Sequence, residues 1–171
     1  MFCYDKKLQY PVKIDRPNPR LARIILTQYG GPDGELGASL RYLSQRYSMP
    51  FDELKGLLTD IGTEELGHLE MVGAIVHQLT RNMKDEQYKD PTFAPYFVDH
   101  TNGVYPASAA GTPWSAMTMQ VKGDPITDLA EDLGAEAAPH HTAIGFCHFL
   151  ERRKVVAAQW FFGLLKGEPF C

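Results

Sequence analysis

The sequence predicts an all-α protein, and three observations support that prediction. Apolar residues recur at three- and four-residue intervals in three separate stretches. No segment of useful length alternates apolar and polar residues, as a half-buried strand would. The length of 171 residues suits one domain with a sizeable buried core.

The first helix is predicted to begin near Arg20, because three earlier prolines favour an extended segment over residues 1–18. Helical spacing then continues as far as Leu43. Gly30-Gly31-Pro32 interrupts this pattern and predicts a kink, a bulge or a break. Met49-Pro50 predicts the end of the element.

The second helix is predicted over Phe51 to about Arg81, with Asp52 as its cap. Its many apolar positions suit a largely buried helix. Residues 82–124 are rich in Pro, Gly, Asn and Asp and predict a long connection. Asp124-Pro125 opens a third helix, with proline at the first helical position.

Composition excludes several classes of protein. The chain is 44% hydrophobic, 22% charged and 11% aromatic, which is typical of a globular protein. A net charge of −4 argues against a nucleic-acid binder. The chain has no apolar run of about 20 residues, no signal-peptide pattern and only three scattered cysteines, so we expect a cytoplasmic protein, or one that reaches a surface by assembly, with no membrane contact.

Glu65 and His68 are three residues apart, so a helix places them on one face. A Glu-x-x-His pair on a bundle helix is half of the ligand set of carboxylate-bridged dinuclear metal proteins. Bridging carboxylates offset the repulsion between two divalent ions, and imidazole completes each coordination shell. The alternative is a solvated acidic face with a histidine that forms ordinary hydrogen bonds.

Two further carboxylates are candidate ligands. Glu35 follows the predicted break, beside apolar positions, although a surface glutamate in a first helical turn would look the same. Glu136 lies on the third predicted helix at helical spacing from Leu129 and Leu133. An exposed acidic face with Glu131 and Asp132 is the alternative for Glu136.

At these residues the chain resembles the manganese catalase family, and within it the spore coat members. The stretches that carry the resemblance include Gly-Thr-Glu-Glu-Leu-Gly-His-Leu-Glu-Met over residues 62–71 and Gln-Tyr-Gly-Gly-Pro-Asp-Gly-Glu-Leu over residues 28–36. The resemblance covers residues 4–136. It implies a ferritin-like four-helix bundle, with a long connection between helices 2 and 3. Residues 1–136 form the region of that bundle that resembles manganese catalase and hold three of its helices, and residues 137–171, where the fourth would lie, do not follow the family.

The resemblance also implies a function. The expected site is a dinuclear manganese centre with Glu35, Glu65, His68 and Glu136 as ligands. The family's activity is the disproportionation of hydrogen peroxide to water and dioxygen. The resemblance to spore coat members implies that the protein forms a homo-oligomer and assembles into the coat with other coat proteins.

Residues 137–171 depart from the family pattern. In the family, the fourth helix carries a second Glu-x-x-His. The nearest match in this chain is residues 151–161, with Lys154 at the position of the glutamate and Ala157 at the position of the histidine. Residues 1–136 hold 13 basic and 19 acidic residues, whereas residues 137–171 hold 4 and 2. Three explanations stay open: a translated frameshift, divergence with loss of metal, or replacement ligands such as His140 or His148.

We therefore expect a spore coat protein that resembles manganese catalase, with weakened or lost activity. A purely structural coat subunit on the same fold is one alternative. A di-iron carboxylate oxidase or peroxide scavenger, with iron in place of manganese, is the other.

Overall fold

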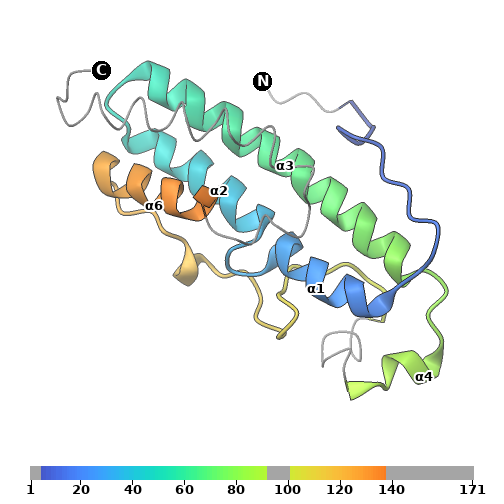
Figure 1. Cartoon of the computed structure of the whole chain (residues 1–171). Coiled ribbons are helices and arrows are strands. Elements are labelled where there is room, and N and C mark those ends of the chain that lie inside the picture. The colour runs from blue at the N-terminus through green and yellow to red at the C-terminus, as the bar shows by residue number, and fades with distance from the viewer. Residues whose placement is uncertain (1–4, 92–100, 138–171) are drawn as a thin grey trace. The chain divides into compact units, whose positions relative to one another are not determined.

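The computed structural model describes residues 5–91 and 101–137, and for residues 136 and 137 the backbone alone (Figure 1). These residues form two compact units. Unit 1 comprises residues 5–40 and Gly62–Met119, and unit 2 comprises Arg41–Ile61 and the described residues from Gln120 onward. Helices α2 and α3 each contribute residues to both units.

The described residues are helical and contain no strand, which confirms the predicted all-α class. An isolated bridge joins Ala107 and Pro113. None of the helices in this part of the chain has the length and hydropathy needed to cross a membrane. The elements in chain order are α1 (Pro19–Gly30), α2 (Glu35–Gln45), η1 (Arg46–Ser48), α3 (Asp52–Thr80), α4 (Asp85–Tyr88), η3 (Ala116–Thr118) and α6 (Pro125–Ala137).

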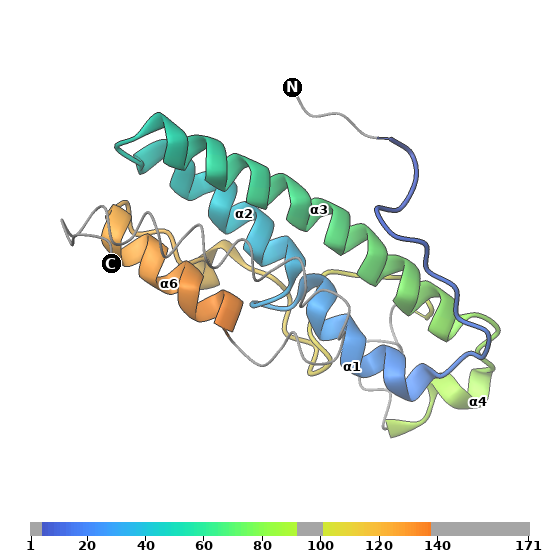
Figure 2. The same ribbon diagram turned by 45° about the horizontal axis from the view of Figure 1, so that its top comes forward.

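Helix α1 of unit 1 begins where the sequence predicts, after a proline-rich extended segment. The Asn18 side chain accepts a hydrogen bond from the Leu21 amide, and Pro19 occupies the first turn. The Asn18 amide donates to the Leu79 carbonyl at 2.9 Å, which ties the start of α1 to the end of α3. Figure 2 shows α1 beside the C-terminal half of α3.

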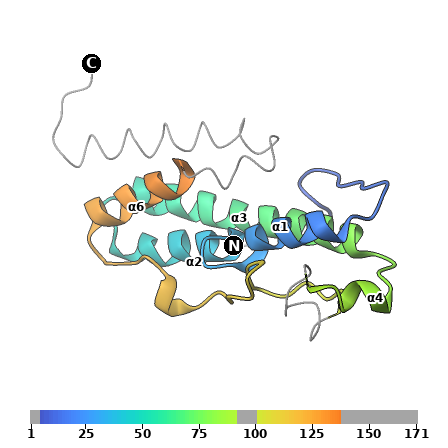
Figure 3. The same ribbon diagram turned by 60° about the horizontal axis from the view of Figure 1, so that its bottom comes forward.

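The extended segment before α1 is held against the end of α3 in the same unit. The Ile14 amide donates to the Gln78 side chain at 2.8 Å, and the Gln78 amide group donates to the Val12 carbonyl at 2.9 Å. Arg81 donates to the Ile14 carbonyl at 2.7 Å. Figure 3 shows α4 directly after this end of α3. Buried side chains of α1 and α3 form the unit's core, together with Ala107: Ala22, Ile25, Leu26, Met71, Val72, Val76 and Leu79.

The predicted interruption at Gly30-Gly31-Pro32 is a complete break between α1 and α2. The Gly31 amide donates to the Thr27 carbonyl, and the Gly34 amide donates to the Gly31 carbonyl, so the chain turns before α2 begins at Glu35. Glycine is required at position 30 because a Cβ there would lie 2.2 Å from the Cα of Pro106. The break thus makes Glu35 the first residue of α2.

In unit 2, helix α6 begins with Pro125 at its first position, as predicted. The buried Asp128 carboxylate accepts hydrogen bonds from the Lys122 and Gly123 amides at 2.8 and 3.1 Å, which fixes the preceding turn. Gln45 of α2 donates to the Asp132 carboxylate at 2.9 Å. The second helix predicted from the sequence, over Phe51 to about Arg81, is also confirmed, because α3 covers Asp52–Thr80.

We predict that Gly30→Ala destabilises the protein by about 1–3 kcal/mol, because the new methyl group meets the backbone of Pro106. Gly56→Ala is the matched control: a Cβ there has nothing within 4 Å, and alanine is the better helix former by up to about 1 kcal/mol. Thermal unfolding of both variants tests this. A Gly30→Ala variant as stable as Gly56→Ala would refute the close approach.

Candidate metal centre

Glu35, Glu65 and His68 come together inside unit 1. The first residue of α2 supplies Glu35, and α3 supplies Glu65 and His68, one turn apart. One ligand atom from each lies within 4.8 Å of the others. All three residues are buried, with 8%, 4% and 3% of their surface exposed. Burial excludes the alternative of a solvated acidic face for these residues.

The imidazole of His68 lies among carboxylates on both sides. Its Nδ1 lies 2.7 Å from Oε2 of Glu65 and 3.9 Å from Oε2 of Glu35. Its Nε2 lies 3.7 Å from Oε1 of Glu64, whose side chain is 30% exposed. The sequence pattern did not single out Glu64 as part of the site. Its position four residues before His68 on a helix was the available signal.

A buried hydrogen bond holds α2 against α3 beside the cluster. The Ser39 hydroxyl donates to the Gly62 carbonyl at 2.7 Å. Ser39 lies one turn after Glu35, and Gly62 lies one turn before Glu65, so this bond sets the register between the two helices at the cluster. Sequence reasoning missed Ser39, and its i+4 spacing from Glu35 was the only sign of it.

The electrostatics of the cluster favour a bound cation. Two buried carboxylates lie within reach of each other, and the imidazole of His68, which carries at most one positive charge, lies beside both. Burying a carboxylate without full compensation costs several kcal/mol. Carboxylate oxygens and an imidazole nitrogen are donors that suit divalent manganese and iron. The donor set therefore fits a metal ion.

Glu136, the fourth predicted ligand, lies near the C-terminal end of α6 in unit 2. Its side chain lies outside the described residues, so the structure does not join it to the other three. Lys154 and Ala157 of residues 137–171, and the histidines considered as replacement ligands, also lie outside the described side chains.

Comparison with known proteins places this cluster in a family. The model of the manganese-containing catalases matches residues 1–145. The chain is 52% identical over 136 residues to protein CotJC of Bacillus subtilis, covering 80% of this chain and 71% of that protein. It is 35% identical over 140 residues to a probable manganese catalase of Clostridium acetobutylicum, covering 80% of this chain and 61% of that protein.

A solved structure agrees with the sequence matches. The manganese catalase KatB from Anabaena superposes with a TM-score of 0.79 at 30% identity, covering all of this chain and 84% of KatB. The chain spans less than two thirds of the length of the matched Clostridium protein. The predicted ferritin-like fold is confirmed. The chain belongs to the manganese catalase family.

Proposed function

We propose that this chain is a spore coat protein with a manganese-catalase-like metal centre whose peroxide-disproportionating activity is weakened or lost. The observation that carries the proposal is the buried cluster of Glu35, Glu65 and His68. The similarity of the chain to the protein CotJC supports placing it with the spore coat members of the family.

Within the proposed site, each side chain has a distinct role. Glu35 and Glu65 supply negative charge to the bound metal, and the burial of both excludes competing water. His68 supplies a neutral nitrogen donor. Glu64, partly exposed beside His68, is placed to exchange protons with solvent. Bound manganese would supply the two-electron redox chemistry of the family.

The proposed loss of activity follows from the ligands that are absent in the sequence. A dinuclear centre of this family needs a second Glu-x-x-His, and the nearest match has Lys154 and Ala157 in those places. Lysine would add positive charge beside the metals, and alanine has no donor atom. We propose Glu136 as a further ligand, which leaves a second metal position short of its nitrogen donor. If resequencing shows that a one-base shift just after Glu136 restores Arg-Glu-x-x-His, the parent protein is a candidate enzyme.

A structural role in assembly is a second candidate function, and the similarity of the chain to the protein CotJC supports it. A coat subunit of this kind would keep the fold of the family and would hold no metal.

We predict that the purified full chain binds at most about one manganese ion per chain with full occupancy and evolves oxygen from hydrogen peroxide slowly or not at all. Elemental analysis and an oxygen electrode test this, with a manganese catalase such as KatB as the positive control. Two manganese ions per chain with rapid oxygen evolution would overturn the proposed loss of activity. Stable binding of iron in place of manganese would favour the oxidase or scavenger alternative.

We also predict that Glu35→Gln has opposite effects on the metal-free and the metal-loaded protein. Removing one buried charge relieves repulsion, so the metal-free variant should unfold at a temperature equal to or higher than the parent's. Added manganese should then raise its unfolding temperature much less than the parent's, because a ligand is lost.

Glu53→Gln is the control for this experiment, since Glu53 is exposed in the first turn of α3. Its response to manganese should match the parent's. If Glu35→Gln keeps the full manganese-dependent stabilisation, Glu35 is not a ligand.

A further inference from the structure

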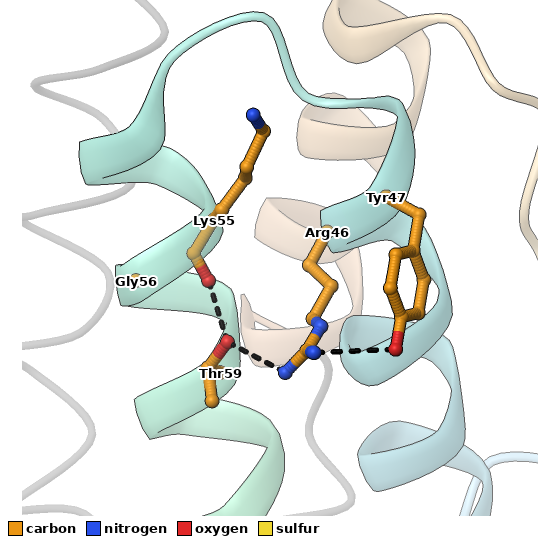
Figure 4. A pocket seen from close by; sticks show the side chains of 5 residues that line it. All are labelled: Arg46, Tyr47, Lys55, Gly56 and Thr59. Carbon is orange, nitrogen blue, oxygen red and sulfur yellow. Dashed lines mark hydrogen bonds between the residues drawn. The ribbon is translucent and has the colours of Figure 1, made fainter.

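A second feature of the molecule lies wholly in unit 2, apart from the metal cluster. A hollow of about 360 Å³ is lined by residues from η1 and the first two turns of α3 (Figure 4). The lining residues are Arg46, Tyr47, Lys55, Gly56 and Thr59. Two of the five are cations, and no acidic side chain is among them.

The Arg46 guanidinium is held in place by neutral groups. It donates to the Thr59 hydroxyl at 3.0 Å and to the Tyr47 hydroxyl at 3.2 Å, and it lies 4.7 Å from the centre of the Tyr47 ring. A guanidinium has five N–H donors, so these two hydrogen bonds leave further N–H groups of Arg46 that can bind a ligand. In the described part of the chain, Arg46 forms no hydrogen bond or ion pair with a carboxylate. It is an oriented cation whose charge is not neutralised there.

The opposite wall of the hollow adds a second cation and open space. Lys55 pairs with Asp52 at 2.8 Å, but the Asp52 side chain is 93% exposed, so solvent weakens that pair. Gly56 has no side chain, and a Cβ there would meet nothing within 4 Å. The Thr59 hydroxyl donates to the Lys55 carbonyl, which turns its lone pairs toward Arg46. A carboxylate entering here would meet the Arg46 guanidinium, and Lys55 adds a second positive charge to the lining.

An exposed aromatic side chain also lines the hollow. Tyr47, whose ring lies against the Arg46 guanidinium, is 77% exposed. Arginine and tyrosine, with tryptophan, are enriched at the energetic centres of protein interfaces. A charged hollow with an exposed aromatic side chain in its lining is typical of a contact surface between proteins.

We propose that this hollow binds an acidic side chain of a second copy of this chain. Charge complementarity favours a second copy as the occupant: the chain carries a net charge of −4, and residues 1–136 hold 19 acidic residues against 13 basic ones, so a second copy offers more carboxylates than cations. A contact between a basic hollow and an acidic surface elsewhere on the molecule is heterologous, and such contacts build rings or extended arrays. This contact rests on the assembly part of the proposed function and gives it a specific binding surface, but it does not depend on the metal cluster.

Sedimentation velocity of the metal-free full chain over a range of concentrations tests this proposal. We expect the parent to self-associate in low salt, and Arg46→Glu to weaken the association at least about tenfold, because an arginine at an interface centre contributes at least that much. Arg20→Glu is the matched control: it makes the same charge change at an exposed position of α1 and should alter the association by less than about twofold.

Lys55→Glu provides a second variant in case Arg46→Glu folds poorly by circular dichroism, since the Lys55 side chain is partly exposed and its ammonium pairs with the exposed carboxylate of Asp52. It should weaken association in the same direction. A parent that stays monomeric would overturn the proposal, as would equal association of the Arg46→Glu and Arg20→Glu proteins. If inorganic phosphate binds at the hollow without weakening association, the hollow serves a small anion and the proposal is wrong. Because the protein is metal-free, these results are independent of metal binding and peroxide activity.

Discussion

The burial of two carboxylates beside one imidazole is the constraint on which the start of α2 and the adjoining part of α3 depend. Glu35 and Glu65 are removed from water, and the single imidazole of His68 beside them carries at most one positive charge. The local structure holds these groups together despite that cost. The break after Gly30 starts α2 at Glu35, and the bond from Ser39 to Gly62 holds the two helices in register. In the proposed function, a bound divalent ion would stabilise this arrangement.

Much of the fold and part of the site could be predicted from the sequence, because both depend on local spacing. Helical periodicity predicted α3, and the i,i+3 rule placed Glu65 and His68 on one face. Features that depend on contacts distant in sequence were missed. Arg41 is 3% exposed, with no hydrogen bond for its Nε and Nη1 among the described residues. No residue pattern indicates such a buried cation, and the hollow beside Arg46 likewise exists only because the chain turns between α2 and α3.

The two proposals assign chemistry and assembly to separate groups of residues. Membership of the manganese catalase family establishes the fold, whereas function resides in particular side chains. Three of the proposed ligands are brought together in unit 1, while the second Glu-x-x-His is missing from the sequence. The cationic hollow of unit 2 uses none of the ligands. A protein that loses catalysis can therefore retain the family's fold and a contact surface, as a coat subunit requires.

Anomalous X-ray scattering at the manganese absorption edge, from crystals of the full chain grown with manganese, tests the central claim most directly. The cluster predicts one strong peak among the side chains of Glu35, Glu65 and His68, at roughly 2.0–2.3 Å from an oxygen or nitrogen of each. Manganese bound elsewhere, or no peak among these three residues in crystals soaked to saturation, would contradict it.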